Sequence, residues 1–234
     1  MTKKWIEIDV TLECNWKCPY CVRLCNLKQN NPSSIMNLDD IKKITDEIKE
    51  IGENNFEHIT LIGGEPTLNP YIIDICKYLK NNLDIKLEIS TNSTNNSKYK
   101  KIIEEIGIKV YTFAGNDNIK KKIKSHINFY VSPTENKQEL RDDCGLNCGI
   151  NISKINNKLT YSYCGNQKYL SILLQKDYLL KNNLHDIYYG DEKIDPLTLE
   201  ICKHCQFKAK NRIHSSTEKI SECFKIGIKK YEEN

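Results

Sequence analysis

The alternation of strand-like and helix-like segments constrains the fold of this 234-residue chain more than any other feature. Short apolar segments predict five strands, at 5–12, 58–62, 85–89, 109–113 and 127–131. Helices are predicted among them at 38–51, 71–79 and 99–106. Strands that alternate with helices through short loops are typical of parallel βα units. We therefore expect an α/β fold whose sheet curves into a partial barrel, with functional residues at the carboxyl ends of its strands.

The cysteines are the second unusual feature, because the chain has eleven of them. The start MTKKWIEIDV lacks the apolar core of a signal peptide, so we expect a cytoplasmic protein. In a reducing compartment, clustered cysteines are more often metal ligands or catalysts than disulfides. Apart from Cys76 they form two groups: Cys14, Cys18, Cys21 and Cys25, then Cys144, Cys148, Cys164, Cys202, Cys205 and Cys223. The two groups predict two metal centres.

The composition argues against two classes of partner. The chain is 39% hydrophobic and 28% charged, with a mean hydropathy of -0.58, and no apolar run reaches membrane-spanning length. The net charge of +4 is small and the lysines are scattered. We therefore expect neither a nucleic acid nor a membrane as partner.

Small or polar groups follow four of the predicted strands. Cys14 follows the first strand, the GGEP stretch at 63–66 follows the second, Ser90-Thr91-Asn92 ends the third, and Ser132 ends the last. GGEP alone is also typical of a turn before a helix. Four such strand ends together predict a single active face.

These motifs resemble those of a known family. Cys14-x3-Cys18-x2-Cys21, with Gly63-Gly64-Glu65 after the second strand, is similar to the signature of the radical S-adenosylmethionine (radical SAM) superfamily. The pairing is far more specific than either motif alone. The resemblance covers residues 1–132.

The resemblance implies a 4Fe–4S cluster held by Cys14, Cys18 and Cys21. Three thiolates leave one iron of the cluster open. In the family, S-adenosylmethionine chelates that iron and is cleaved by an electron from the reduced cluster, giving a 5'-deoxyadenosyl radical that abstracts hydrogen from the substrate. Cys25 as a fourth ligand would abolish this activity, so we expect it to be a buried or loop thiol.

The resemblance also assigns cofactor-binding roles at matching positions. Backbone atoms of Gly63, Gly64 and Glu65 are expected to meet the methionine amino group, since glycine leaves room for close approach. The remaining candidates are Tyr20 and the pair Val131 and Ser132 beside the adenine, with Ser90 and Asn92 near the ribose or carboxylate. A polar residue that ends a strand is also commonly a simple cap or turn.

The C-terminal hundred residues resemble an auxiliary-cluster module. Cys148 and Cys164 flank a predicted hairpin whose turn is Asn156-Asn157, since asparagine tolerates the positive φ of a tight turn. A helix is predicted over 170–180, followed by Cys202-Lys203-His204-Cys205. This order is similar to the twitch domain, the shortened form of the SPASM module.

The module implies a second, auxiliary 4Fe–4S cluster bound by Cys148, Cys164, Cys202 and Cys205. Cys144 also satisfies the spacing of the first ligand, and a zinc ribbon also satisfies the spacing of the whole set. The expected architecture is a partial (β/α)6 TIM-type barrel over 1–135, then a small module of β-hairpin plus helix over 136–234.

A compact radical SAM barrel followed by a module with one auxiliary cluster resembles 2-deoxy-scyllo-inosamine dehydrogenase in architecture. That resemblance implies an oxidoreductase that dehydrogenates a small alcohol or sugar-like molecule, with the auxiliary cluster as electron acceptor. Arg141, between the barrel and the first auxiliary cysteine, is a candidate catalytic residue or a surface arginine of a charged linker. We expect a small-molecule or short-peptide substrate, a reductant such as flavodoxin or ferredoxin, and a monomer.

Three other functions fit parts of the pattern. A radical SAM maturase would form a thioether, an epimer or a crosslink in a ribosomally synthesised peptide, but the first strand at about residue 5 leaves no room for an N-terminal peptide-recognition domain. Glycyl-radical activation fits the short chain, although its extra clusters usually precede the GGE motif. A non-catalytic electron carrier would need neither GGEP nor an open iron.

Overall fold

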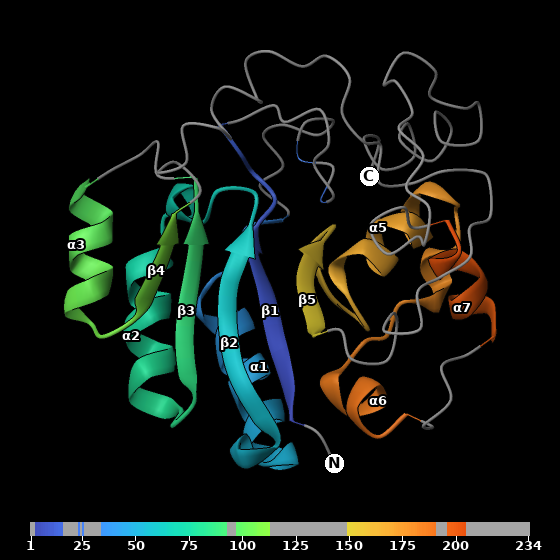
Figure 1. Cartoon of the computed structure of the whole chain (residues 1–234), viewed down its shortest axis with the longest axis horizontal. Helices are drawn as coiled ribbons and strands as arrows, with labels where there is room; N and C mark the ends of the chain where they lie inside the picture. The colour runs from blue at the N-terminus through green and yellow to red at the C-terminus, as the bar shows by residue number, and fades with distance from the viewer. Residues whose placement is uncertain are drawn as a thin grey trace.

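Figure 1 shows the computed structural model of the chain. The structure describes residues 3–15, 23, 25, 34–92, 97–112, 149–190 and 196–204. Within these residues no helix is both long and apolar enough to cross a membrane.

The described strands form one six-stranded sheet with the order β4-β3-β2-β1-β5-β6. The strands are β1 (Lys4–Thr11), β2 (Phe56–Gly63), β3 (Lys86–Thr91), β4 (Lys109–Thr112), β5 (Ile150–Ile155) and β6 (Lys158–Ser162). Strands β1 to β5 are parallel to one another, and β6 is antiparallel to β5. The predicted parallel α/β fold is thus confirmed, while the predicted strand at 127–131 lies outside the described residues.

The helices gather in two places. They are α1 (Leu38–Ile51), α2 (Ile72–Asn82), α3 (Ser97–Glu105), α5 (Gly165–Leu173), α6 (Leu184–Tyr188) and α7 (Pro196–Cys202), with short 3-10 turns η2 (Glu53–Asn55), η3 (Pro66–Leu68) and η4 (Asp177–Leu179). In Figure 1, α1 and α2 lie behind the sheet, with α3 next to α2 at the β4 end, whereas α5, α6 and α7 lie at the β5–β6 end. Helix α1 has the predicted bounds. Asn37 and Asp40 form a capping box at its start, and Gly52, with a φ of 101°, follows its last residue.

The two faces of β1 differ in character because side chains alternate along a strand. Ile6, Ile8 and Val10 are fully buried in the same apolar core as the inward-facing isoleucines of α1 and α2. Burial of each such side chain stabilises the fold by about 1.5–3 kcal/mol. The opposite face of the strand carries Glu7 and Asp9 and is therefore polar.

The predicted hairpin forms and joins the main sheet. Asn156 and Asn157 have φ of 50° and 61° at its turn, as a tight type I′ hairpin requires. Strand β5 pairs in parallel with β1, with Ile6 opposite Ile150. The expected domain division at 135/136 lies outside the described residues and stays a prediction.

The helix predicted over 170–180 was wrong in its bounds. Helix α5 begins at Gly165 and ends at Leu173. Gln175 then adopts a left-handed φ of 58°, and the N–H of Lys176 donates to the carbonyl of Ser171 at 2.6 Å. A left-handed residue turns the chain out of the helix, although the apolar pattern continues beyond it.

Candidate active site

Cys14 lies just beyond the carboxyl end of β1. Its side chain is partly exposed and packs against a small apolar cluster that contains Leu12, Cys25, Tyr169 and Leu173. Cys25 is 1% exposed, which confirms that it is a buried thiol. Cys18 and Cys21 lie outside the described residues, so the structure places one of the three predicted ligands of the N-terminal cluster.

The Gly63-Gly64 loop lies directly against the segment that leads to Cys14. The N–H of Gly64 donates to the carbonyl of Thr11 at 2.8 Å, and the N–H of Glu65 donates to that of Glu13 at 2.7 Å. A Cβ on Gly63 would lie 2.2 Å from the Thr11 oxygen, and one on Gly64 would lie 2.0 Å from the Glu13 oxygen. Both positions therefore require glycine, because any side chain would push β1 and this loop apart.

The Glu65 carboxylate joins the ends of β2 and β3. It is fully buried, and its Oε1 accepts hydrogen bonds from the Thr67 N–H (3.1 Å), the Thr67 hydroxyl (2.6 Å) and the Thr91 hydroxyl (2.6 Å). Its Oε2 accepts from the N–H of Asn92 at 2.7 Å. A buried carboxylate is tolerated when its oxygens are satisfied in this way. The Glu65 side chain therefore joins the loop after β2 to the end of β3. Because its carboxylate oxygens are already bonded, a ligand at this loop would contact backbone atoms.

Asn92 connects β3 to the cysteine segment. Its Nδ2 donates to Oδ1 of Asn15 at 2.8 Å and lies 4.0 Å from Sγ of Cys14. Ser90 lies two residues earlier on β3 and is 8% exposed. The ends of β1, β2 and β3 thus meet, as predicted, around Cys14.

The other predicted site residues are not placed. Tyr20, Val131, Ser132 and Arg141 lie outside the described residues. Their assigned roles, and those of Gly63, Gly64, Glu65, Ser90 and Asn92 toward a cofactor, stay predictions.

Two of the predicted auxiliary ligands lie on helices that pack together. Cys164 is the N-cap of α5, where its Sγ accepts the N–H of Gln167 at 3.3 Å. A helix N-terminus favours a thiolate. Cys202 is the last residue of α7 and is 9% exposed, and α7 packs on α5 through Ile201 and Leu170.

The complete ligand sets are not visible. Cys144, Cys148 and Cys205 lie outside the described residues. Among the residues that are placed, no group of three or more histidine, cysteine or acidic side chains could hold a metal ion.

The sequence patterns missed a buried charge network on the polar face of β1. Asp9 is fully buried, and its Oδ1 lies 2.8 Å from Nε of Arg23. Its Oδ2 lies 3.1 Å from Nζ of the fully buried Lys168 and accepts the Tyr169 hydroxyl at 3.0 Å. Glu7 lies 2.8 Å from Arg23 Nη2, so two carboxylates face two cations. The signal for this network was present, because acidic residues alternate with isoleucine in β1.

The network sets the ionisation of Asp9. Burial alone would raise the pKa of this carboxyl. The charges of Arg23 and Lys168 and the hydrogen bond from Ser153 outweigh burial, so the pKa of Asp9 is well below its usual value. Asp9 is therefore charged at all physiological pH values.

Comparisons with known proteins agree with the cysteine and glycine motifs. The model of the Radical SAM superfamily matches residues 8–130. The chain is 27% identical over 157 residues to a probable GTP 3',8-cyclase of Methanococcus maripaludis, covering 60% of this chain and 51% of that one. It is 30% identical over 90 residues to the GTP 3',8-cyclase of Pectobacterium atrosepticum, covering 38% and 26%. The chain thus spans about half the length, or less, of these curated relatives.

One solved structure shares the fold over nearly the whole chain. It is the crystal structure of SeMet BtrN in an open conformation, which matches with a TM-score of 0.51 and 15% identity over 94% of both chains. At this identity the likeness concerns the fold alone.

Proposed function

This chain belongs to the radical SAM superfamily, and from that premise we propose that it cleaves S-adenosylmethionine reductively where the ends of β1, β2 and β3 meet. The family implies a 4Fe–4S cluster and S-adenosylmethionine as cofactors. The observation that carries the proposal is that Cys14 directly follows Glu13, which the Gly63-Gly64 loop contacts, and has its sulfur 4.0 Å from the Asn92 amide.

The residues at this edge fit such a cluster. Cys14 is partly exposed at the strand end, and the Asn92 amide lies 4.0 Å from its sulfur, where it favours a thiolate. Together with Cys18 and Cys21 it would supply three thiolates. When bound, the cluster supplies the electron that breaks the sulfonium and yields the 5'-deoxyadenosyl radical.

The chain's own residues would then position the cofactor. The buried Glu65 carboxylate fixes the Gly63-Gly64 loop against β3, so the loop backbone is preorganised to meet the methionine amino group. Ser90 and Asn92 would contact the ribose or carboxylate. Tyr20, Val131 and Ser132 would flank the adenine.

We propose dehydrogenation of a small alcohol or sugar-like molecule as the reaction. A hydroxyl-bearing carbon radical on the substrate becomes a carbonyl by losing one electron and the hydroxyl proton. A base would take the proton, and a second 4Fe–4S cluster on Cys148, Cys164, Cys202 and Cys205 would accept the electron. The packing of α5 on α7, which carry Cys164 and Cys202, supports this second site. Arg141 is proposed near the substrate, and flavodoxin or ferredoxin as the reductant of a monomeric enzyme.

The names of the curated relatives favour a second candidate, the radical cyclisation of a purine nucleotide. The relative from Methanococcus maripaludis is 27% identical over 157 residues, although that match covers only 51% of the relative. Modification of a ribosomally synthesised peptide is a further alternative. Incubation with GTP, with an aminocyclitol and with a short peptide, each followed by mass spectrometry, distinguishes these reactions.

The first experiment measures 5'-deoxyadenosine after anaerobic reconstitution and reduction with dithionite. The wild type is expected to form it, and Cys14→Ala is expected to form none above background. Cys76→Ala is the matched control, because this thiol is buried in α2 and burial raises its pKa to about 12. Equal product from wild type and Cys14→Ala would contradict the proposal.

Iron analysis then tests the second cluster. Two 4Fe–4S clusters predict about eight irons per chain, falling to about four in the Cys14/Cys18/Cys21→Ala variant. About four irons falling to none, with zinc in the wild type, would remove the electron acceptor from the dehydrogenase but leave radical SAM chemistry intact.

A further inference from the structure

Strand β1 has one residue more than β2 at its carboxyl end. Asp9 lies opposite Ile62 of the neighbouring strand. Thr11 lies opposite Gly63, so two steps along β1 match a single step along β2. The extra residue is Val10, which makes this position a β-bulge. Bulges are frequent next to active sites, where they change the direction of the side chains that follow.

The bulge changes the face of the sheet on which Leu12 and Cys14 lie. In a regular strand, Asp9 and Leu12 would point to opposite faces because they are three residues apart. Leu12 instead packs in the same cluster as Tyr169 of α5, whose hydroxyl donates to Asp9. Cys14 packs against this cluster too, whereas Val10 lies in the apolar core with α1 and α2. Leu12 and Cys14 therefore share the polar face with Asp9, as one extra residue requires.

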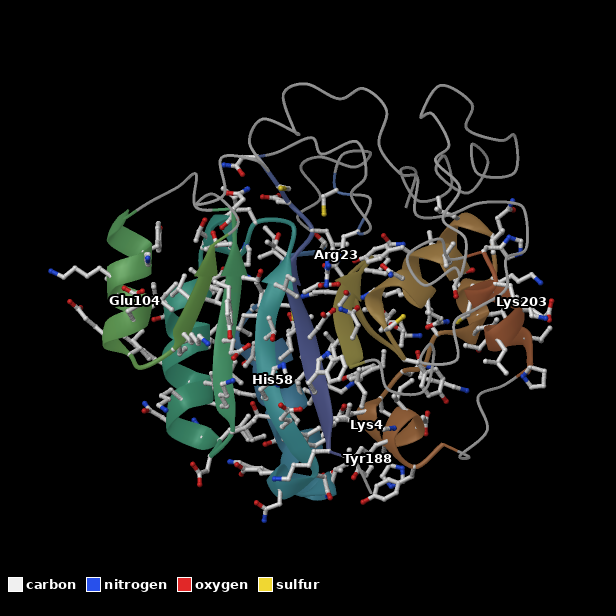
Figure 2. The ribbon with its side chains drawn as sticks, in the orientation of Figure 1. Lys4, Arg23, His58, Glu104, Tyr188 and Lys203 are labelled. Carbon is white, nitrogen blue, oxygen red and sulfur yellow. The ribbon has the colours of Figure 1, made fainter. Side chains whose placement is uncertain are left out.

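The polar face of β1 is the side on which α5 packs. Figure 2 shows Arg23, which lies 2.8 Å from Asp9, at the upper end of β1 on the side toward β5. Lys168 of α5 lies 3.1 Å from the other oxygen of Asp9. Without the bulge, Cys14 would lie on the same side as Val10, against the apolar core. An apolar environment disfavours a thiolate, which is the form that binds metal.

Asn69 stabilises the bulge. Its side chain is buried, and Nδ2 donates to the carbonyl of Val10 at 2.7 Å and to that of Met36 at 2.9 Å. Its Oδ1 accepts the N–H of Tyr71 at 2.8 Å. The N–H of Met36 also donates to the Val10 carbonyl, at 2.9 Å. Val10 has no partner residue in the described strands β2 and β5, so these two bonds replace those of the sheet.

We propose that Asn69 is a positioning residue, which keeps Cys14 on the polar face by stabilising the bulge at Val10. The proposal rests on the proposed function, because the face on which Cys14 lies matters only if its sulfur binds the cluster. Loss of the bulge would shift this sulfur relative to the Gly63-Gly64 loop, the expected contact of S-adenosylmethionine. Binding of S-adenosylmethionine should therefore weaken when Asn69 is replaced.

The test measures kcat and the KM for S-adenosylmethionine in the formation of 5'-deoxyadenosine by the reconstituted chain. Asn69→Leu keeps the approximate size of the side chain and removes both donors. Asn82→Leu is the matched control. The Asn82 amide also donates to a backbone carbonyl, that of Tyr78 at 2.8 Å, but at the end of α2 that leads to the amino end of β3. Urea denaturation gives the folded fraction of each variant.

Asn69→Leu is expected to raise the KM about tenfold or more, as for other residues that orient metal ligands. Asn82→Leu should keep the wild-type KM, and an equal rise in both variants would overturn the proposal. A role of Asn69 in folding alone would lower kcat in proportion to the folded fraction and leave the KM unchanged, which would also overturn it.

A milder variant covers the case in which Asn69→Leu does not fold. The hydroxyl of Asn69→Ser can donate to one carbonyl but not to both. A KM above that of the wild type in Asn69→Ser would support the proposal, and a wild-type KM would overturn it.

The outcomes separate this proposal from the proposed function. Wild-type formation of 5'-deoxyadenosine, with an unchanged KM in Asn69→Leu, would overturn the role of Asn69 and leave the radical SAM activity standing. A wild type that forms no 5'-deoxyadenosine would overturn both, and this is seen before any variant is made.

Discussion

At the scale of single residues, Gly63 and Gly64 allow β1 and β2 to end in contact. The N–H groups of Gly64 and Glu65 can reach the carbonyls of Thr11 and Glu13 only because Gly63 and Gly64 have no Cβ that would separate the two segments. Since Cys14 follows Glu13 directly, the position of the sulfur depends on this contact.

Gly64→Ala should disrupt the site as well as the fold. Its Cβ would lie 2.0 Å from the Glu13 oxygen, so we expect a loss of about 1–3 kcal/mol in the free energy of unfolding. Formation of 5'-deoxyadenosine should also fall to near background. The control is Gly107→Ala, where φ is +85° and the nearest atom, Cε of Lys80, is 3.7 Å away. This control should cost about 1 kcal/mol and keep activity, and equal activity of the two variants would contradict the role of Gly64.

Glu65→Gln tests the buried carboxylate at the same scale. The two threonine hydroxyls can rotate to accept from an amide, but the N–H groups of Thr67 and Asn92 cannot. One of them would face an NH₂ group or lose its partner if the amide rotates away, so urea denaturation should show a loss of about 1–3 kcal/mol. Glu57→Gln, whose side chain is 61% exposed, should change stability by less than about 0.5 kcal/mol. A similarly small change at Glu65 would show that its hydrogen bonds are dispensable.

At the scale of elements, α5 connects the two cysteine regions. It begins at Cys164, contributes Lys168 and Tyr169 to the Asp9 network, and packs through Tyr169 and Leu173 in the same cluster as Leu12 and Cys14. A shift of this helix would therefore change the positions of both Cys14 and Cys164, one predicted ligand of each cluster.

Cys164 has two roles that substitutions can separate. Cys164→Ala removes the group that accepts the Gln167 N–H and should destabilise the iron-free protein by about 1 kcal/mol, whereas Cys164→Ser keeps an N-cap oxygen and should not. Both variants should lose the iron of the auxiliary site. Thermal unfolding of the iron-free proteins and iron analysis after reconstitution provide the two measurements. Retention of about eight irons by either variant would show that Cys164 is not a ligand.

At the scale of the whole molecule, the buried network makes the fold sensitive to acid. The pKa of Asp9 is lower in the folded protein than in the unfolded chain, because Arg23 and Lys168 favour its charged form. The stabilisation is therefore complete above about pH 5, beyond the unfolded pKa, and is lost progressively as the pH falls toward the folded pKa.

Asp9→Asn should remove this part of the pH dependence. Between about pH 5 and pH 3, the free energy of unfolding of the wild type should fall more steeply than that of the variant, by about 1 kcal/mol. Chemical denaturation at several pH values provides the measurement. Asp46→Asn, at an exposed position on α1, is the control and should keep the wild-type slope. Parallel curves for wild type and Asp9→Asn would exclude Asp9 as the titrating group.

Local patterns determined the elements and the chemistry. The bounds of α1, the turn at Asn156-Asn157 and the parallel strands follow from the spacing of apolar residues and from turn propensity, which act over a few residues. The three cysteines and the glycine pair indicated the family because their chemistry requires them at those spacings.

Tertiary structure alone decided which distant residues meet. It placed the hairpin beside β1, ended α5 at Leu173 and brought Arg23 and Lys168 to Asp9. The pairing of strands and of buried charges depends on packing between segments up to 159 residues apart, as for Lys168 and Asp9. Periodicity and propensity describe only neighbours in the chain, so they mark acidic residues in a strand without showing which cations will balance them.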